Sequence, residues 1–432
     1  MMRAPAAFPM RLIMSHRYPP GAICQASAAH RRKIPGSPKR GNRPRKCAVT
    51  PLYSMRKLIT NARIISPGID LPNAAVLIEG DRIEAVIEGT NLPASTVKID
   101  VGGRLLMPGF IDIHSHGADG HDICDDSIES LRHIARRKLQ EGVTTWLPTT
   151  LTQPKDKLKS IAGKIAAFRA QGGLTRCPGM HVEGPFINKE KAGAQNPQFV
   201  RPPDFAELED LHAIMPVMIL SLAPEMPGAL ELIDGCRSLG ITCSAAHTAA
   251  TAAQIHAACD AGLRHLTHYG NAMTPLHHRE VGAIGAGILD ERLMLELISD
   301  CIHLTPDMVK LIFKVVPIDR LMMITDSVAA SWIVEGEIQL GGLDVVVQDR
   351  VARLKEGGAL AGSTLLANEG FKNLVGMTGL PLHEVIKTAS WNQARSLGLK
   401  DLGKVAPGFL ADLVLLNDDY SVAGTLVGGE ER

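Results

Sequence analysis

The segment FIDIHSHG, residues 110–117, is the part of the sequence that decides the fold. It is a short apolar run that ends in His114 and His116, which are two residues apart and therefore point to the same side of a strand. Seven more apolar runs of strand length follow, and helical stretches such as SIESLRHIARRKLQEG (127–142) separate most of them. Strands that alternate with helices in this way predict an α/β protein with a (β/α)8 barrel of the TIM type. An open doubly wound sheet is the alternative, but no GxGxxG motif follows the first strand. The eight expected strands span residues 110–114, 143–149, 179–184, 217–223, 241–247, 263–268, 293–299 and 321–326.

Two β-rich regions flank the expected barrel. Short alternating strands with turn residues between them fill residues 55–108, and a second such region begins after Asp326. We expect the two regions to join in one small β-sandwich domain beside the barrel. The expected division of the chain is a basic extension at 1–54, the first part of the sandwich at 55–108, the barrel at 109–330, and the rest of the sandwich with helices packed on the barrel at 331–432.

Composition excludes several classes of protein. The chain has 432 residues, of which 45% are hydrophobic, so it can bury a sizeable core and is not a disordered scaffold. No apolar run approaches the roughly 20 residues that span a bilayer, so no membrane span is expected. The eight cysteines contain no CxxC pair, which argues against a disulfide framework and indicates a reducing, cytoplasmic location.

Charge is distributed unevenly along the chain. Residues 1–55 hold eleven Lys and Arg and no acidic residue, which leaves 35 basic against 45 acidic residues in the remainder. Three interpretations of the basic extension stay open: a translation start placed before a true start at Met55, an organelle transit segment, or a tail that binds nucleic acid. The acidic body disfavours the last, because it would repel phosphate backbones, and no nucleic-acid partner is expected.

Polar residues that can bind metal stand at the ends of five expected strands. Active sites of TIM barrels lie at the carboxyl ends of their strands, so these side chains should meet at one rim. Imidazole and carboxylate ligands suit a divalent metal such as zinc, or iron or manganese. The strand-end residues are His114 and His116 after the first strand, Glu183 after the third, His247 after the fifth, His268 after the sixth and Asp326 after the eighth.

Several motifs give the chain a family resemblance. In order along the sequence they are PGFIDIHSHG, HVEGPFIN with NPQFVR, AAHT, THYGNAMTPLHHRE, ITDS, LAGSTLL and ADLVLL. Together they resemble the amidohydrolase superfamily and, within it, the N-acetylglucosamine-6-phosphate deacetylases, over essentially all of residues 55–432. The resemblance implies metal-dependent removal of the acetyl group from N-acetylglucosamine 6-phosphate, which gives glucosamine 6-phosphate and acetate in amino-sugar catabolism.

The resemblance also implies roles for individual residues. Glu183, His247 and His268 match the ligands of the primary metal, and His114 and His116 match the pair that holds a second ion in some members. One or two ions of zinc, iron, manganese or cobalt are therefore implied for each subunit. Asp326 matches the catalytic acid and base, and the residues that match Arg279 and His303 reach the phosphate across a dimer interface, which implies a homodimer. The implied substrate-binding residues are Ala194, Gln195, Asn271, Ala272, Arg279, His303, Leu360, Ala361 and Gly362.

Departures from the family pattern keep other substrates open. Gln195 replaces a family histidine beside the acetyl group, THYGNAM replaces THLxNAM, and TDS replaces TDA. N-acetylgalactosamine 6-phosphate or an acylated amino acid is therefore an alternative substrate. A cyclic-amide hydrolase is disfavoured, because Glu183 stands where such enzymes carry a carbamylated lysine. A non-catalytic assembly protein is also disfavoured, because all of the metal ligands are present.

Overall fold

The computed structural model describes residues 56–89, 91–93 and 97–432. The basic extension at 1–54 lies outside the described residues, and so does Met55. Among the described residues, no helix is long and apolar enough to cross a membrane.

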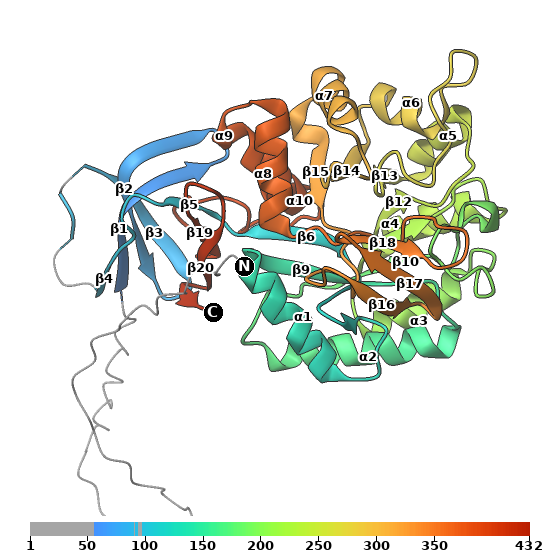
Figure 1. Ribbon diagram of the computed structural model, residues 1–432, viewed down its shortest axis with the longest axis horizontal. Helices are drawn as coiled ribbons and strands as arrows, with labels where there is room; N and C mark the ends of the chain where they lie inside the picture. The colour runs from blue at the N-terminus through green and yellow to red at the C-terminus, as the bar shows by residue number, and fades with distance from the viewer. Residues whose placement is uncertain (1–55, 90, 94–96) are drawn as a thin grey trace, which may run out of the picture. The chain divides into compact units, whose positions relative to one another are not determined.

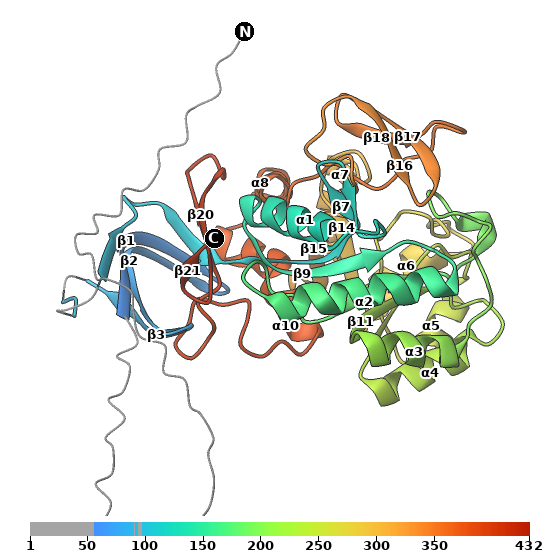
Figure 2. The ribbon, with the colours of Figure 1, turned by 90° about the horizontal axis from the view of Figure 1, so that it is seen from below.

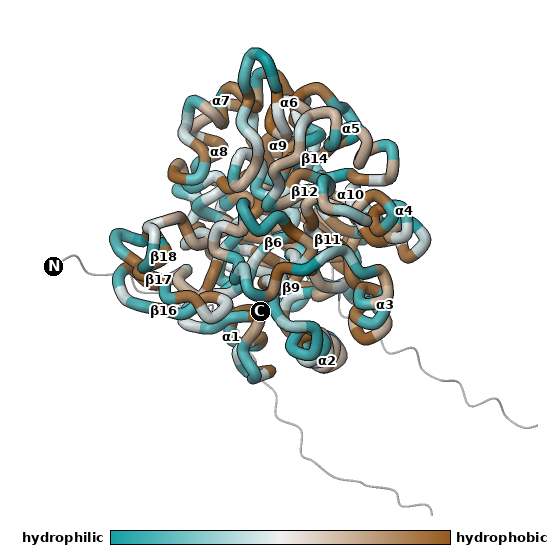
Figure 3. Tube along the Cα trace, turned by 90° about the vertical axis from the view of Figure 1, so that its right-hand side faces the viewer, coloured by the Kyte–Doolittle hydropathy of each residue, from teal (hydrophilic) through white to brown (hydrophobic). Residues whose placement is uncertain are grey.

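Eight parallel strands form the central sheet, and each matches one of the eight expected runs. Their order in the sheet is their order in the sequence, and helices α1 to α7 surround them in Figure 3. The first and last strands share no regular ladder. A single bridge between Ser115 and Ser327 and a hydrogen bond from Asp326 N to His114 O (2.9 Å) connect them, so the barrel is nearly closed. The strands are β6 (Phe110–Ser115), β9 (Val143–Thr150), β10 (Met180–Glu183), β11 (Val217–Leu222), β12 (Thr242–Ala245), β13 (Leu263–Leu266), β14 (Met294–Ile298) and β15 (Leu321–Ile324).

Several helices around the barrel have capping residues at their ends. The side chain of Ser127 caps α1, Thr251 and Gln254 form a capping box on α5, and Thr305 caps α7 before a proline in the first turn. Glycine follows the last residue of α2, α4 and α5, as in many helix C-caps. These helices are α1 (Ile128–Gln140), α2 (Lys155–Gln171), α3 (Phe205–Ile214), α4 (Ala229–Leu239), α5 (Ala252–Ala261), α6 (Gly282–Leu289) and α7 (Pro306–Val315).

A β domain made from both ends of the described chain adjoins the barrel (Figure 1). Its eight-stranded sheet has the order β21-β20-β19-β5-β1-β2-β3, with β4 paired to β1. An ion pair between Arg176 and Asp412 and a hydrogen bond from Thr425 Oγ1 to Leu139 O (2.8 Å) join it to the barrel. The strands are β1 (Arg56–Ser66), β2 (Ile69–Glu79), β3 (Arg82–Glu88), β4 (Val97–Asp100), β5 (Leu105–Pro108), β19 (Leu413–Leu416), β20 (Val422–Val427) and β21 (Glu430–Glu431).

The second β-rich region does not join this domain as expected. Strands β16 (Gly336–Leu340), β17 (Leu343–Gln348) and β18 (Val351–Leu354) form a separate three-stranded sheet, visible apart from the β domain in Figure 2. Its apolar residues, including Leu340 and Val345, pack with Leu151 and Val328 from loops that follow barrel strands. The expectation of a single sandwich therefore holds for residues 413–431 and is wrong for 336–354, because the barrel buries the apolar face of this small sheet.

The remaining elements are helices near the C-terminal end of the chain, a short pair of strands and three 3₁₀ helices. Helices α8 (Ala367–Thr378), α9 (Leu382–Val385) and α10 (Trp391–Ser396) follow the small sheet, and β7 (Gly117–Ala118) pairs with β8 (His121–Asp122) just after β6. The described residues also include the short 3₁₀ helices η1 (Lys189–Lys191), η2 (Ile318–Arg320) and η3 (Ile386–Ala389).

Candidate metal centre and substrate pocket

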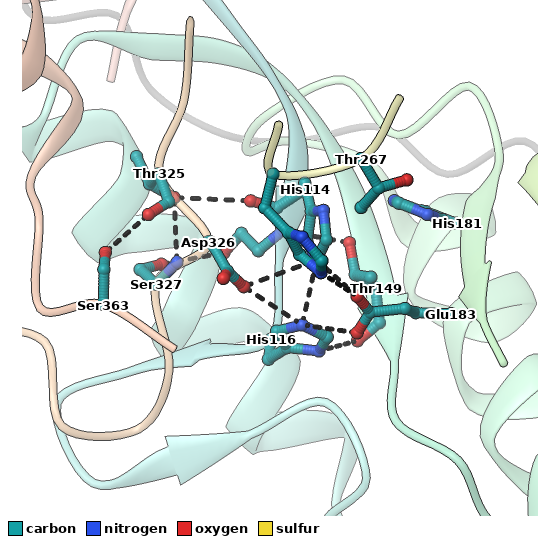
Figure 4. A network of polar contacts seen from close by, with 12 residues as sticks. His114, His116, Thr149, His181, Glu183, Thr267, Thr325, Asp326, Ser327 and Ser363 are labelled. Atoms are coloured by element: carbon teal, nitrogen blue, oxygen red, sulfur yellow. Dashed lines mark hydrogen bonds and ion pairs between the residues drawn. The ribbon is translucent and has the colours of Figure 1, made fainter. Parts of the chain in front are cut away.

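Glu183 belongs to both groups of histidines that the sequence predicts, and Figure 4 shows it beside His114 and His116. Its Oε1 is 3.3 Å from His247 Nε2 and 3.2 Å from His268 Nε2. Its Oε2 is 3.2 Å from His116 Nε2, and its Oε1 is 3.5 Å from His114 Nε2. The five side chains thus form two ligand sets that share Glu183, one with His114 and His116 and the other with His247 and His268.

The electrostatics of the cluster favour a bound cation. Ring nitrogens face each other at 3.1 Å between His114 Nε2 and His116 Nε2, and at 3.3 Å between His247 Nε2 and His268 Nε2. Unprotonated nitrogens at such distances present lone pairs to one another, and a cation among them removes this repulsion. Burial opposes a positive charge on His116, but Asp326 and Glu183 outweigh it and raise its pKa to about 9. The residues therefore fit a divalent metal with imidazole and carboxylate ligands.

Three of the strand-end residues have an unusual backbone conformation. His247, His268 and Asp326 have φ angles of 45°, 32° and 49°, in the left-handed region that non-glycine residues rarely adopt. Each such residue costs about 1–3 kcal/mol and persists only where its surroundings hold it. Main-chain hydrogen bonds do so here, from Asn188 N to His247 O (3.0 Å) and from Ser363 N to Asp326 O (2.8 Å).

In two of the histidines, the other ring nitrogen contacts a main-chain carbonyl oxygen behind the cluster. His247 Nδ1 is 2.8 Å from Lys191 O, and His116 Nδ1 is 3.2 Å from Thr149 O. His114 Nδ1 faces the buried Glu296 Oε2 at 3.6 Å. A partner at Nδ1 fixes the tautomer and leaves Nε2 for the metal, as is usual for histidine ligands.

Asp326 lies beside His114 and His116 and lines a cavity. Its Oδ1 is 3.3 Å from both His114 Nε2 and His116 Nε2, and its side chain is almost fully buried. Burial opposes its ionisation, but the two histidines outweigh this and lower its pKa to about 2. Asp326 is therefore a carboxylate at neutral pH and can accept a proton.

A cavity of about 290 Å³ opens in front of the cluster. Seven of the nine residues expected to bind substrate line it, namely Ala194, Gln195, Asn271, Ala272, His303, Leu360 and Gly362. Ala361 is fully buried in the core under the small sheet, and Arg279 is exposed in the turn that follows Asn271. Leu340 of β16 also lines the cavity, so the small sheet forms one of its walls.

His303 differs from the expectation that it reaches the pocket of a partner subunit. It lines the cavity of its own chain, because the loop after β14 opens at the same rim as the other strand ends. Asp300 Oδ2 is 2.7 Å from His303 Nδ1. Burial lowers the pKa of this histidine, but Asp300 outweighs it and the net shift is upward. His303 Nε2 is thereby left for a ligand.

Gln195 connects the pocket to the metal cluster. Its side-chain amide nitrogen donates to Glu183 Oε2, and its amide oxygen accepts from Thr152 N at 2.6 Å. The side chain is buried, with 3% exposed. An amide nitrogen carries two hydrogens, so the second remains for a substrate oxygen.

Sequence reasoning missed two residues of this site. Lys191 lines the cavity, and its ammonium makes no ion pair or hydrogen bond with the residues that the structure describes. Glu296, behind His114, is a charged residue within the apolar run LMLELIS (293–299), and that contrast is a signal that could have marked it.

A barrel with two metal ligand sets at its rim is the architecture of a metal-dependent hydrolase, and comparison with known proteins defines the family. Residues 105–432 match the amidohydrolase family, and the chain belongs to it. It is 37% identical to an N-acetylgalactosamine-6-phosphate deacetylase of Escherichia coli O157:H7, over 81% of this chain and 92% of that protein. It is 34% identical to an N-acetylglucosamine-6-phosphate deacetylase of Bacillus subtilis (strain 168), over 86% of this chain and 96% of that protein.

A solved structure agrees with these relatives. It is a mutant N-acetyl-D-glucosamine-6-phosphate deacetylase of Mycobacterium smegmatis in complex with N-acetyl-D-glucosamine-6-phosphate. It has a TM-score of 0.83 and 32% sequence identity, and the match covers 87% of this chain and 99% of that chain.

Proposed function

We propose that the chain hydrolyses the N-acetyl group of N-acetylglucosamine 6-phosphate and releases acetate and glucosamine 6-phosphate. The observation that carries the proposal is the contact of Asp326 with His114 and His116 beside the cavity, in a chain about a third identical to such deacetylases. The substrate class comes from what those relatives are named for. The chain is accordingly an amidohydrolase of amino-sugar catabolism.

Glu183, His247 and His268 would hold one divalent cation, and His114 and His116 with Glu183 would hold a second. Zinc is the metal we propose, because tetrahedral sites with nitrogen and oxygen ligands suit it. A bound cation of this kind supplies a lowered pKa of water and polarisation of the acetyl carbonyl.

The chain's own residues perform the proton transfers. Asp326 accepts a proton from the water that attacks the acetyl carbon and donates it to the sugar nitrogen as the C–N bond breaks. The second amide hydrogen of Gln195, which Glu183 does not accept, would donate to the acetyl oxygen as negative charge develops there.

The phosphate of the substrate requires cationic and hydrogen-bonding groups in the cavity. Lys191 and His303 line it within the same chain. Arg279 is exposed outside this cavity, which supports a role at the cavity of a partner subunit in a homodimer. The unpaired cysteines of the described residues and the phosphorylated substrate support a cytoplasmic location.

A galactosamine substrate is the second candidate, because the first relative above is named for N-acetylgalactosamine 6-phosphate. The two substrates differ in the configuration of one hydroxyl group. Acetate release from both epimers and from unphosphorylated N-acetylglucosamine, by zinc-loaded protein, separates them. Turnover of the glucosamine phosphate above the other two supports the main proposal, and turnover of the galactosamine phosphate alone replaces it.

The role of Asp326 has a separate test. Asp326→Asn removes the proton acceptor and keeps the shape of the side chain. We expect turnover to fall by a factor of roughly 10²–10⁴ with the cation content unchanged. Near-normal turnover in the loaded variant would reject the acid and base role.

A further inference from the structure

A buried lysine lies beside the metal cluster, and the proposed reaction does not use it. Lys138 of α1 is fully buried, and its Nζ is 3.1 Å from Asp112 Oδ2 and 3.2 Å from Glu141 Oε2. Burial opposes its charge, but Glu141 and Asp112 outweigh this and raise its pKa, so the ammonium stays protonated. A fully buried lysine is rare in proteins and needs such partners.

The remaining contacts of Lys138 reach both neighbours of Asp326. Its Nζ donates to Ser327 Oγ at 2.8 Å and to Thr325 Oγ1 at 3.2 Å. Thr325 Oγ1 in turn donates to Asp112 Oδ2 at 2.6 Å. The ammonium therefore contacts the residues on both sides of Asp326, the proposed acid and base.

The same segment holds the strand that carries His114 and His116 (Figure 4). Ser327 O accepts from His116 N at 2.7 Å, and His114 O accepts from Asp326 N at 2.9 Å. These contacts cross the seam between β6 and β15, where the barrel has no regular ladder. The side chains around Lys138 therefore add to the few main-chain contacts that set the relative position of these two strand ends.

The backbone of Asp326 has its own need for support. Its left-handed conformation (φ 49°) is unfavourable for a non-glycine residue and requires contacts on both sides. Ser363 N donates to its carbonyl oxygen, and Lys138 donates to the hydroxyl groups of its two neighbours, Thr325 and Ser327.

We propose that Lys138 is a positioning residue for the deacetylase reaction, which aims the Asp326 carboxylate at the reacting atoms through Thr325 and Ser327. The inference rests on the function proposed above. In this proposal the hydroxyl of Ser327 accepts a hydrogen bond from Lys138, and Ser327 stands where the family pattern has alanine.

Three variants remove this support in different ways. Ser327→Ala and Thr325→Val each delete one hydroxyl that Lys138 contacts. The double variant Lys138→Met with Glu141→Gln deletes the ammonium and one carboxylate together, so that the cluster keeps its net charge and Asp112 is the only buried ion left in it. Thr325→Ser is the matched control that keeps the hydroxyl, and Lys159→Met is the control at a partly exposed lysine that pairs with Asp210 on the surface.

We expect kcat to fall about 10- to 100-fold in the three variants, with KM within about twofold of wild type, because misplacing a catalytic group by about 1 Å has effects of this size. Zinc content should equal that of wild type, and Thr325→Ser should recover most of kcat. Lys159→Met should match wild type. The combination of lost kcat, kept KM and kept zinc is not expected from a lysine that only stabilises the fold.

Two results would overturn the positioning role. One is an unchanged kcat in folded, zinc-loaded Ser327→Ala and Thr325→Val, and these single variants decide the matter even where the double variant fails to fold. The other is a loss of kcat that follows loss of zinc in proportion. All variants are compared with wild type on whichever sugar phosphate the wild type hydrolyses, so an inactive wild type rejects the proposed function and is distinguishable from both results.

Discussion

The side-chain amide of Gln195 donates a hydrogen bond to Oε2 of Glu183, the carboxylate shared by both metal ligand sets. Gln195→Leu would leave this oxygen and Thr152 N without their buried partner and would remove the proposed donor to the acetyl oxygen. We expect kcat to fall by about 10²-fold, the usual cost of losing one donor to a developing oxyanion. Gln195→His keeps a ring N–H donor and should retain more activity.

The control for Gln195 is a nearby glutamine outside the cavity. Gln198 does not line the cavity, and Gln198→Leu should leave kcat unchanged. Equal kinetics for Gln195→Leu and Gln198→Leu, measured as acetate release at saturating substrate, would contradict the role of the amide.

Lys191 lines the cavity, and we propose that its ammonium contacts the phosphate of the substrate. Lys191→Met should raise KM for the phosphorylated sugar about tenfold, the equivalent of about 1.4 kcal/mol, with a small effect on kcat. The same variant should not change the kinetics of the unphosphorylated sugar. Lys189→Met is the matched control, because Lys189 belongs to the same turn, is exposed and does not line the cavity. A parallel rise of KM on both sugars would place Lys191 away from the phosphate.

The sequence predicts the barrel and its metal cluster because both follow from local pattern. Each strand is an apolar run of the right length, and the barrel topology places every strand end at one rim. The pattern of strands alone is therefore enough to bring His114, Glu183 and Asp326 together. The exact contacts among them, such as the 3.3 Å from Asp326 Oδ1 to His114 Nε2, depend on packing across the whole barrel.

The sequence-based predictions fail where the packing partner of a segment or side chain is distant in sequence. Alternating apolar residues at 336–354 predict strands with one buried face, but the pattern does not say that the barrel covers that face. Lys138 looks like an ordinary lysine of an amphipathic helix, because its partners Asp112 and Thr325 are distant in sequence. Lys191 stands in a loop of charged residues whose position over the cavity is set by the fold.

The raised pKa of His116 predicts how stability responds to pH when no cation is bound. The imidazole has an ordinary pKa of 6.5 and a folded-state pKa of about 9. Its contribution to stability is therefore fully present below pH 6.5 and is lost as the pH rises through about 9. We expect the free energy of unfolding of the cation-free protein to fall by about 3 kcal/mol over this interval from this group alone. Chemical denaturation at a series of pH values measures it.

Two additions complete the pH experiment. Saturating zinc should remove the loss, since the ligands bind the cation without their protons. His116→Gln should flatten the dependence, whereas His278→Gln, at an exposed loop histidine, should keep it. A cation-free protein with constant stability between pH 6.5 and 9 would contradict the raised pKa.

Gly362 is a position where the backbone beside Asp326 leaves no room for a side chain. Its φ is +57°, and an added Cβ would lie 2.4 Å from Val328 Cγ1 and 3.0 Å from Asp326 O. Gly362→Ala should therefore lower the free energy of unfolding by roughly 1–2 kcal/mol for the left-handed alanine, and further for the steric overlap. The thermal midpoint should fall with it, and kcat should fall as Asp326 moves. Gly376→Ala is the control within α8, where an added Cβ meets nothing within 4 Å, and it should stabilise the protein by about 0.5–1 kcal/mol. Thermal unfolding and acetate release on both variants check the pair, and a Gly362→Ala protein as stable and active as wild type would show that the loop after Asp326 yields without cost.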